Sequence, residues 1–99
     1  MPAYVIAVLQ VTDEEEYDRY RQQTPGTLAL YGGKFIARGD HLEVLEGDWE
    51  PTRVVLIEFD SVEQAKRWWT SPEYEAIKPL RQAAANSSLL VVEGVSGQA

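Results

Sequence analysis

Two separate segments of this chain follow the same pattern. Residues 10–17 (Gln-Val-Thr-Asp-Glu-Glu-Glu-Tyr) can be laid over residues 58–65 (Glu-Phe-Asp-Ser-Val-Glu-Gln-Ala), and each segment follows an apolar, strand-like run and opens an amphipathic helix. The chain therefore reads strand–helix–strand twice. This repeat predicts an α+β fold of the split βαβ, ferredoxin-like type (βαββαβ), with a four-stranded antiparallel sheet and both helices on one of its faces.

Length and composition restrict the class of protein further. We expect residues 1–99 to form one domain, with a core of about residues 3–95 and a frayed tail at 96–99. The net charge of −7, from 16 acidic and 9 basic residues, disfavours nucleic-acid binding, because phosphate contacts need clustered Lys and Arg. No apolar run approaches the roughly 20 residues that span a bilayer, and the first residues lack the basic region of a signal peptide. We therefore expect a cytoplasmic protein with no membrane or nucleic-acid partner. Without cysteine it has no disulfide or zinc–sulfur site.

The patterning also predicts where the strands and helices begin. The expected strands are 3–11, 34–38 with a continuation at 42–46 after a bulge or turn at 39–41, 53–59, and 88–95. Thr12 with Glu15, and Ser61 with Gln64, form capping-box patterns at the starts of the two helices.

Prolines predict breaks in both helical segments. The segment 24–26 (Thr-Pro-Gly) is expected to interrupt the first helix, and Ser71-Pro72 should restart the second. Pro79 should kink or break the last helix, because proline removes a backbone donor. Asn86 or Ser87 should end that helix.

Both faces of the predicted sheet are largely apolar. In the first strand, for example, Val5 and Ala7 alternate with Ile6 and Val8, whereas an antiparallel sheet with one wet face alternates apolar with polar residues. Two helices in so short a chain cover only one face, and the other would expose far more apolar surface than the few hundred Å² usual in monomers. We therefore expect a two-fold homodimer that packs sheet against sheet. The alternative is a monomer with mixed strand patterning.

The repeat predicts which side chains enter the space between two such sheets. Phe59 and Val11 occupy equivalent points before the two helices and should pack beneath them, so Gln10 and Glu58 should point the other way. Since the first and third strands lie side by side at the centre of this topology, we expect Gln10 and Glu58 to meet inside an apolar cavity.

Arg38 and Tyr4 are expected at the same cavity. Arg38 shares the parity of Ile36 on the second strand and would pair with the carboxylate of Glu58. Tyr4 shares a strand face with Gln10 and is expected to contact the ligand. A buried carboxylate of this kind is a reasonable site hypothesis. The rival interpretation is that Gln10, Glu58 and Arg38 form a structural polar network or lie near a wet rim.

Five short motifs carry a resemblance to a known family. They are residues 31–35 (Tyr-Gly-Gly-Lys-Phe), 37–39 (Ala-Arg-Gly), 44–49 (Val-Leu-Glu-Gly-Asp-Trp), 57–59 (Ile-Glu-Phe) and 71–74 (Ser-Pro-Glu-Tyr). Together they resemble the domain-of-unknown-function family thirteen-thirty, over nearly the whole chain. The resemblance implies the dimeric α/β-barrel superfamily, whose members include cofactor-free monooxygenases, muconolactone isomerase and haem-binding proteins. It implies the same fold and dimer but no settled function.

Two residues in predicted loops are expected in different environments, one at the surface and one at the cavity or the dimer interface. His41, the only histidine, lies in a predicted turn and is expected at the surface. One histidine cannot build a multi-histidine metal site. Trp49 lies in a Gly-Asp-Trp loop and is expected to close the mouth of the cavity or to pack across the dimer.

Three arginines and a tyrosine are further candidates for ligand binding. Tyr74 and Arg81 are seven residues apart and lie on roughly one helix face. Tyr74 would offer its hydroxyl to a ligand, or else be a core residue with a tethered hydroxyl. Arg38, Arg53 and Arg81 would each suit a carboxylate-bearing ligand, because guanidinium binds carboxylate bidentately. Each would alternatively pair with one of the many acids.

Two functions are compatible with these patterns, and neither requires a cofactor. The first is a homodimer that binds a small, partly apolar or carboxylate ligand in the inter-sheet cavity. As an enzyme it would be a cofactor-independent oxygenase or isomerase, with Glu58 as proton acceptor or orienter, Gln10 and Arg38 holding an oxyanion, and Trp49 shielding the site. The second is a non-catalytic binding or assembly module whose cavity is filled by its own side chains.

Overall fold

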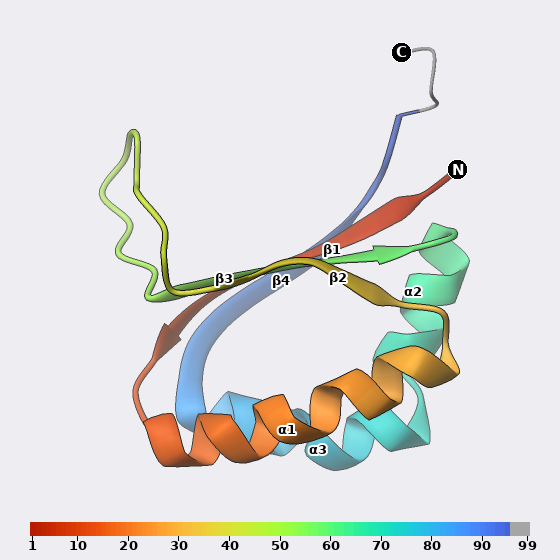
Figure 1. Cartoon of the computed structure of the whole chain (residues 1–99), viewed down its shortest axis with the longest axis horizontal. Helices are drawn as coiled ribbons and strands as arrows, with labels where there is room; N and C mark the ends of the chain where they lie inside the picture. Colours follow the sequence, from red (N-terminus) through yellow and green to blue (C-terminus); the bar gives the residue numbers. More distant parts are fainter. Residues whose placement is uncertain (96–99) are drawn as a thin grey trace.

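The computed structural model describes residues 1–95. In chain order its elements are β1 (Ala3–Val11), α1 (Glu14–Leu30), β2 (Lys34–Gly39), β3 (Arg53–Phe59), α2 (Val62–Trp69), α3 (Pro72–Ala84) and β4 (Ala85–Glu93). The strands form one antiparallel sheet in the order β2-β3-β1-β4, and the helices lie on one face of it (Figure 1). The predicted βαββαβ arrangement is confirmed, with the second helical segment divided into α2 and α3. The predicted tail, 96–99, lies outside the described residues.

Short polar side chains begin each helix. The side chains of Asp13, Ser61 and Ser71 accept hydrogen bonds from the backbone N–H three residues later, at 3.2, 3.1 and 3.1 Å. Such caps satisfy otherwise unpaired donors in the first turn. The caps at Ser61 and Ser71 were predicted. At the first helix the prediction of Thr12 was wrong, because its backbone N–H and its hydroxyl both donate to the Ala84 carbonyl at the end of α3.

The helices continue through both internal prolines. α1 contains Pro25 and α3 contains Pro79, so the predicted interruption at 24–26 was wrong. One missing backbone hydrogen bond at a proline is offset where the turns on either side pack on the core, and here Tyr20 and Leu28 are buried on the two sides of Pro25. α3 also ends at Ala84, earlier than predicted, because β4 already pairs with β1 from Ala85 onward.

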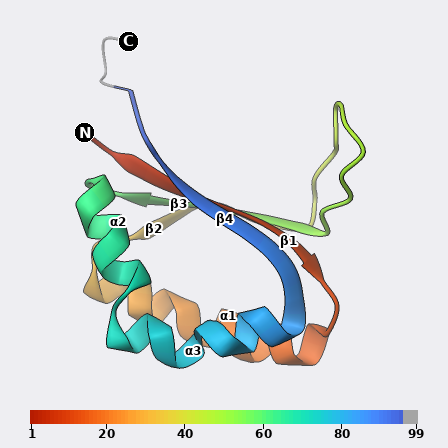
Figure 2. The same cartoon turned by 180° about the vertical axis from the view of Figure 1, so that it is seen from behind.

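The second strand ends at Gly39 without the predicted continuation, and its bulge lies at 35–37, ahead of the bulge or turn predicted at 39–41. Phe35 pairs with Ile57 and Ala37 pairs with Leu56, which leaves Ile36 as the extra residue. The predicted strand continuation at 42–46 was wrong: these residues belong to the β2–β3 connection, which rises on the side of the sheet opposite the helices (Figures 1 and 2).

The core lies between the helices and one sheet face. Alternate residues of the two central strands are buried against the helices, and Phe59 and Val11 pack there as predicted. Trp68 of α2 is fully buried and its neighbour Trp69 is half-buried. Within residues 1–95, no helix covers the other face of the sheet (Figure 2), which carries exposed apolar side chains: Ile36, Leu90 and Val92 at 52, 58 and 45%. The strand pattern predicted a sheet with two apolar faces, only one of them covered by helices, and this prediction is confirmed.

Close packing around Gly33 provides a test of this core. A Cβ at Gly33 would lie 2.8 Å from the Phe59 ring and 2.9 Å from a Leu28 methyl carbon. Gly33→Ala should therefore lower the free energy of unfolding by about 1–3 kcal/mol, measured by urea denaturation. Gly26→Ala is the matched control: its Cβ would meet nothing within 4 Å, and it should stabilise α1 by about 0.5–1 kcal/mol. Equal effects of the two substitutions would contradict this packing.

Candidate ligand site

A narrow cavity lies between the helical layer and the sheet. Its apolar floor comes from the strands and from Trp68, and its polar groups come from α1, α3, β2 and β3. The cavity has a volume of about 30 Å³, enough for one or two water molecules and too small for a substrate unless side chains at its mouth move. The residues that carry chemistry around it are Tyr17, Tyr20, Arg21, Arg38, Arg53 and Arg81.

The charge around this cavity is the reverse of the charge on the whole chain. The net charge is −7, yet four of the nine basic residues line the cavity and none of the 16 acidic residues does. Arg21 forms an ion pair with Asp18 at 2.8 Å. Arg38, Arg53 and Arg81 form no ion pair with any residue of the described range 1–95. The cavity therefore concentrates positive charge that acidic side chains do not neutralise.

Arg53 is held at the cavity by the start of β3. It pairs with Leu9, at the end of β1 that leads into α1, and its guanidinium carbon lies 5.3 Å from the centre of the Tyr17 ring. Its Nε is buried and has no hydrogen-bond partner in the described residues, which is costly for a charged donor. Burial raises the pKa of Tyr17, and the positive charge of Arg53 opposes that rise.

Arg38 reaches the cavity because of the bulge in β2. Without the bulge it would share a face with Ile36, as predicted, but the extra residue reverses the parity and brings Arg38 opposite Val55 on the helix-facing side. Its guanidinium carbon lies 4.4 Å from the centre of the Phe35 ring, a cation–π distance. Arg21, Arg38 and Arg53 also border an outer depression of about 290 Å³. The cavity and the depression therefore share three arginines.

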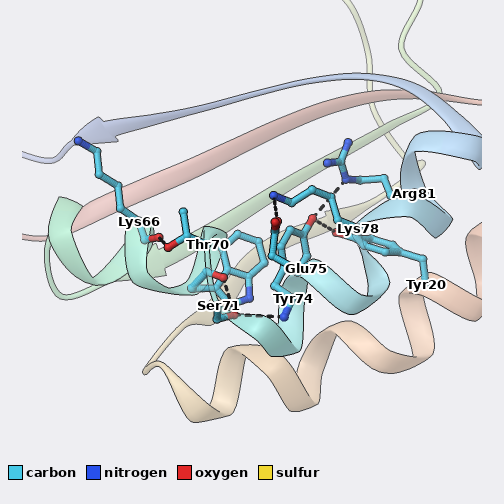
Figure 3. Close-up of polar contacts among 9 residues, drawn as sticks. Tyr20, Lys66, Thr70, Ser71, Tyr74, Glu75, Lys78 and Arg81 are labelled. Atoms are coloured by element: carbon cyan, nitrogen blue, oxygen red, sulfur yellow. Dashed lines mark hydrogen bonds and ion pairs between the residues drawn. The ribbon is translucent and has the colours of Figure 1, made fainter.

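A hydrogen-bonded chain runs from Arg81 to Tyr20 (Figure 3). Arg81 donates from Nε to the Tyr74 hydroxyl at 3.2 Å and from Nη1 to the Ser87 hydroxyl, and the Tyr74 and Tyr20 hydroxyls lie 2.8 Å apart. The predicted sharing of a helix face by Tyr74 and Arg81 is confirmed. Tyr20, Tyr74 and Arg81 are all buried, at 7, 0 and 4% exposure. Burial raises the pKa of the Tyr20 hydroxyl far above its ordinary value, so it is a proton-bearing donor at neutral pH.

Gln10 and Glu58 do not meet, contrary to prediction. The central strands are antiparallel, so Glu58 lies opposite Tyr4 and Gln10 lies six residues farther along β1, opposite Asn86 of β4. At about 3.3 Å per residue the two are roughly 20 Å apart. Gln10 and Glu58 each lie at the end of a strand that leads into a helix. Because the two strands run in opposite directions, these two strand ends lie at opposite ends of the strand pair. Arg38, on the other face, does not join them either.

The remaining predicted residues lie away from the cavity. Tyr4 is half-buried on the uncovered sheet face, packed over Gly94. Trp49 is 55% exposed and borders a shallow depression with Gln10. His41 is exposed, as predicted. In residues 1–95 no group of three or more His, Asp or Glu side chains is placed to hold a metal ion, and no helix there is long and apolar enough to cross a membrane.

Tyr17, Tyr20, Arg21 and Phe35 line the cavity, and sequence reasoning did not select them as site residues. Two of them had a visible signal: Tyr17 and Tyr20 are three residues apart on the inner face of α1. Phe35 had none, because its side of β2 depends on the bulge.

The fold is shared with several solved structures. A protein of unknown function from Rhodopseudomonas palustris is 22% identical, with a TM-score of 0.81 over 96% of this chain and 83% of its own. A dimeric ferredoxin-like protein of unknown function from Jannaschia is 13% identical, with a TM-score of 0.76 over 95% and 100%. SnoaB, a cofactor-independent oxygenase from Streptomyces nogalater, is 14% identical, with a TM-score of 0.69 over 96% and 94%. No curated protein matches the sequence.

These likenesses place the chain in the ferredoxin-like α+β class. The profile of the family described as a domain of unknown function (DUF1330) matches residues 2–95, and the chain belongs to that family.

Alkaline pH should weaken the fold through the buried tyrosines. Burial holds the pKa of Tyr17 and Tyr20 above their ordinary value of 10.0. The unfolded chain therefore releases these protons first, so stability is complete below about pH 10 and falls as the pH rises above it. Tyr20→Phe should reduce that slope by up to about 1.4 kcal/mol per pH unit in urea titrations between about pH 8 and 11. A slope identical to that of the parent protein would contradict the burial of an un-ionised Tyr20.

Proposed function

We propose that this protein binds a small, partly apolar carboxylate in the cavity between its helices and its sheet. The observation that supports the proposal is the set of arginines around an apolar floor, three of them without an acidic partner in residues 1–95. Buried positive charge is stable when it is paired, and a ligand carboxylate would supply the missing partner. Arg53 is the main anchor, because its buried Nε still lacks an acceptor.

Ligand entry requires the mouth of the cavity to open. The cavity holds about 30 Å³, whereas the adjoining depression holds about 290 Å³, close to the lower size limit of small-molecule pockets. Arg21 and Arg38 line both, and both side chains are exposed. Long exposed side chains change rotamer in picoseconds to nanoseconds. Their displacement joins the two volumes without moving the backbone.

The protein acts as a homodimer in this proposal. The uncovered sheet face bears Ile36, Leu90 and Val92, each at least 45% exposed, and an apolar face of this kind is stabilised by a second copy packed on it. The similar protein from Jannaschia is described as dimeric. Gln10, Glu58 and Tyr4 would then face the partner, and Glu58 would act there and not in the helix-side cavity.

The same cavity could also support catalysis, which is a more specific form of the binding proposal. SnoaB, which shares the fold, is a cofactor-independent oxygenase, and the arginine-lined cavity would hold the oxyanion that oxygenase or isomerase chemistry generates. The predicted base, Glu58, lies on the opposite face of the sheet. No carboxylate lines the cavity, so a proton acceptor would have to come from the substrate.

A second candidate function is a non-catalytic assembly module with a filled cavity. The small volume of the cavity favours it. In that case the arginines would only support the helix–sheet interface, and no carboxylate would bind.

Phenylacetate and its uncharged analogue phenylacetamide separate the two functions. Phenylacetate should bind in isothermal titration calorimetry and phenylacetamide should bind at least about tenfold more weakly, since hydrogen bonds to charged groups contribute about 1.5–3 kcal/mol. Arg53→Gln should weaken phenylacetate binding by a similar factor. Arg67→Gln is the control, because Arg67 is exposed on α2 and donates to Gln64 away from the cavity. No preference for phenylacetate would support the assembly module.

Sedimentation equilibrium tests the dimer. At micromolar concentration the protein should give twice its 11.2 kDa mass. Leu90→Glu places a charge on the uncovered face and should yield monomers. Ala83→Glu adds the same charge on the exposed side of α3 and should leave the dimer intact. A monomer in the parent protein would refute the dimer without touching the cavity proposal.

A further inference from the structure

The hydrogen-bonded chain of Arg81, Tyr74 and Tyr20 has a fixed direction at its Arg81 end. A guanidinium group only donates hydrogen bonds, so Arg81 Nε donates to the Tyr74 hydroxyl. Each phenol carries one hydrogen, and the Tyr74 and Tyr20 oxygens share one hydrogen bond in which either could be the donor. The two possible directions leave different hydrogens without a partner.

In one direction Tyr20 donates to Tyr74. The Tyr74 hydroxyl then accepts twice, and its own hydrogen has no partner in the described residues, although Tyr74 is 0% exposed and does not border the cavity. A buried donor without an acceptor costs about 1–3 kcal/mol.

In the other direction Tyr74 donates to Tyr20. Both hydrogen bonds of the chain then have a donor, and the one phenol hydrogen left without a partner is that of Tyr20, which does border the cavity. The positive charge at the Arg81 end polarises both hydroxyls and strengthens this last donor. The satisfied arrangement therefore presents one hydrogen-bond donor to the cavity.

We propose that Tyr20 forms a second polar subsite, which accepts a carbonyl or hydroxyl oxygen of a ligand whose carboxylate is held by Arg53. This inference rests on the proposed carboxylate function and names its substrate class: oxo- or hydroxy-substituted carboxylic acids. Arg53 contacts Tyr17, and Tyr20 lies three residues farther along α1, a rise of about 4.5 Å. A small molecule with two oxygen groups separated by a few bonds spans that distance. Tyr74 and Arg81 act as positioning residues.

Matched pairs of ligands test the subsite. The pairs are pentanoate with 4-oxopentanoate, and phenylacetate with 4-hydroxyphenylacetate; within each pair the two acids differ by the second oxygen. The parent protein should bind the oxygenated member about three- to tenfold more tightly, the range expected for one hydrogen bond. In Tyr20→Phe the ratio should fall to about one while the affinity for pentanoate changes by less than about twofold.

Tyr74→Phe provides an independent measurement. It retains the Tyr20 hydroxyl but disconnects it from Arg81, so the ratio should fall part of the way toward one. A purely structural role of these tyrosines would weaken both members of a pair equally and leave the ratio unchanged, which would overturn the inference. The inference is also overturned if the parent protein does not prefer the oxygenated member of each pair. The carboxylate proposal would stand in that case. If neither pentanoate nor phenylacetate binds, the carboxylate function fails, and the subsite fails with it.

Discussion

The antiparallel pairing of β1 with β3 at the centre of the sheet determines most of what surrounds it. It sets Leu9 opposite Arg53, at the end of β1 from which the chain turns into α1. Arg53 therefore lies beneath the first turns of that helix, against Tyr17. The same pairing places Glu58 at the far end, opposite Tyr4. The position of the cavity follows from this register, because a strand residue reaches the helical layer only where a helix crosses above it.

The distribution of charge separates two environments in one small protein. Acidic residues follow the exposed helix starts, where they complement the helix dipole, as at Glu14, Glu15 and Glu16. Four arginines collect instead around the cavity between the layers, where the guanidinium groups of Arg38 and Arg53 lie over the rings of Phe35 and Tyr17. An anionic ligand would therefore meet a cluster of positive charge at the proposed cavity, on a protein whose net charge is −7.

The two faces of the sheet also differ in how they are covered. The helix-facing side is closed by large aromatic residues, with the Trp68 and Tyr74 rings only 4.1 Å apart, and polar groups there are linked in defined chains. The other side is left apolar and open within residues 1–95. Its exposure, and the connection that rises beside it (Figure 1), are the reason that we propose it as the surface for assembly, whereas the proposed small-molecule site lies on the helix side.

The sequence alone determined the order of the elements, two of the three helix caps, the core positions of the central strands and the two-faced sheet, because these depend on local periodicity and on single side chains such as Ser61 and Ser71. Tertiary structure decided the site. The antiparallel register separated Gln10 from Glu58, and one extra residue at Ile36 moved Arg38 to the opposite face. Strand register and bulges arise from pairing between distant segments. No local pattern encodes them, yet a shift of one residue moves a side chain from one face of a sheet to the other.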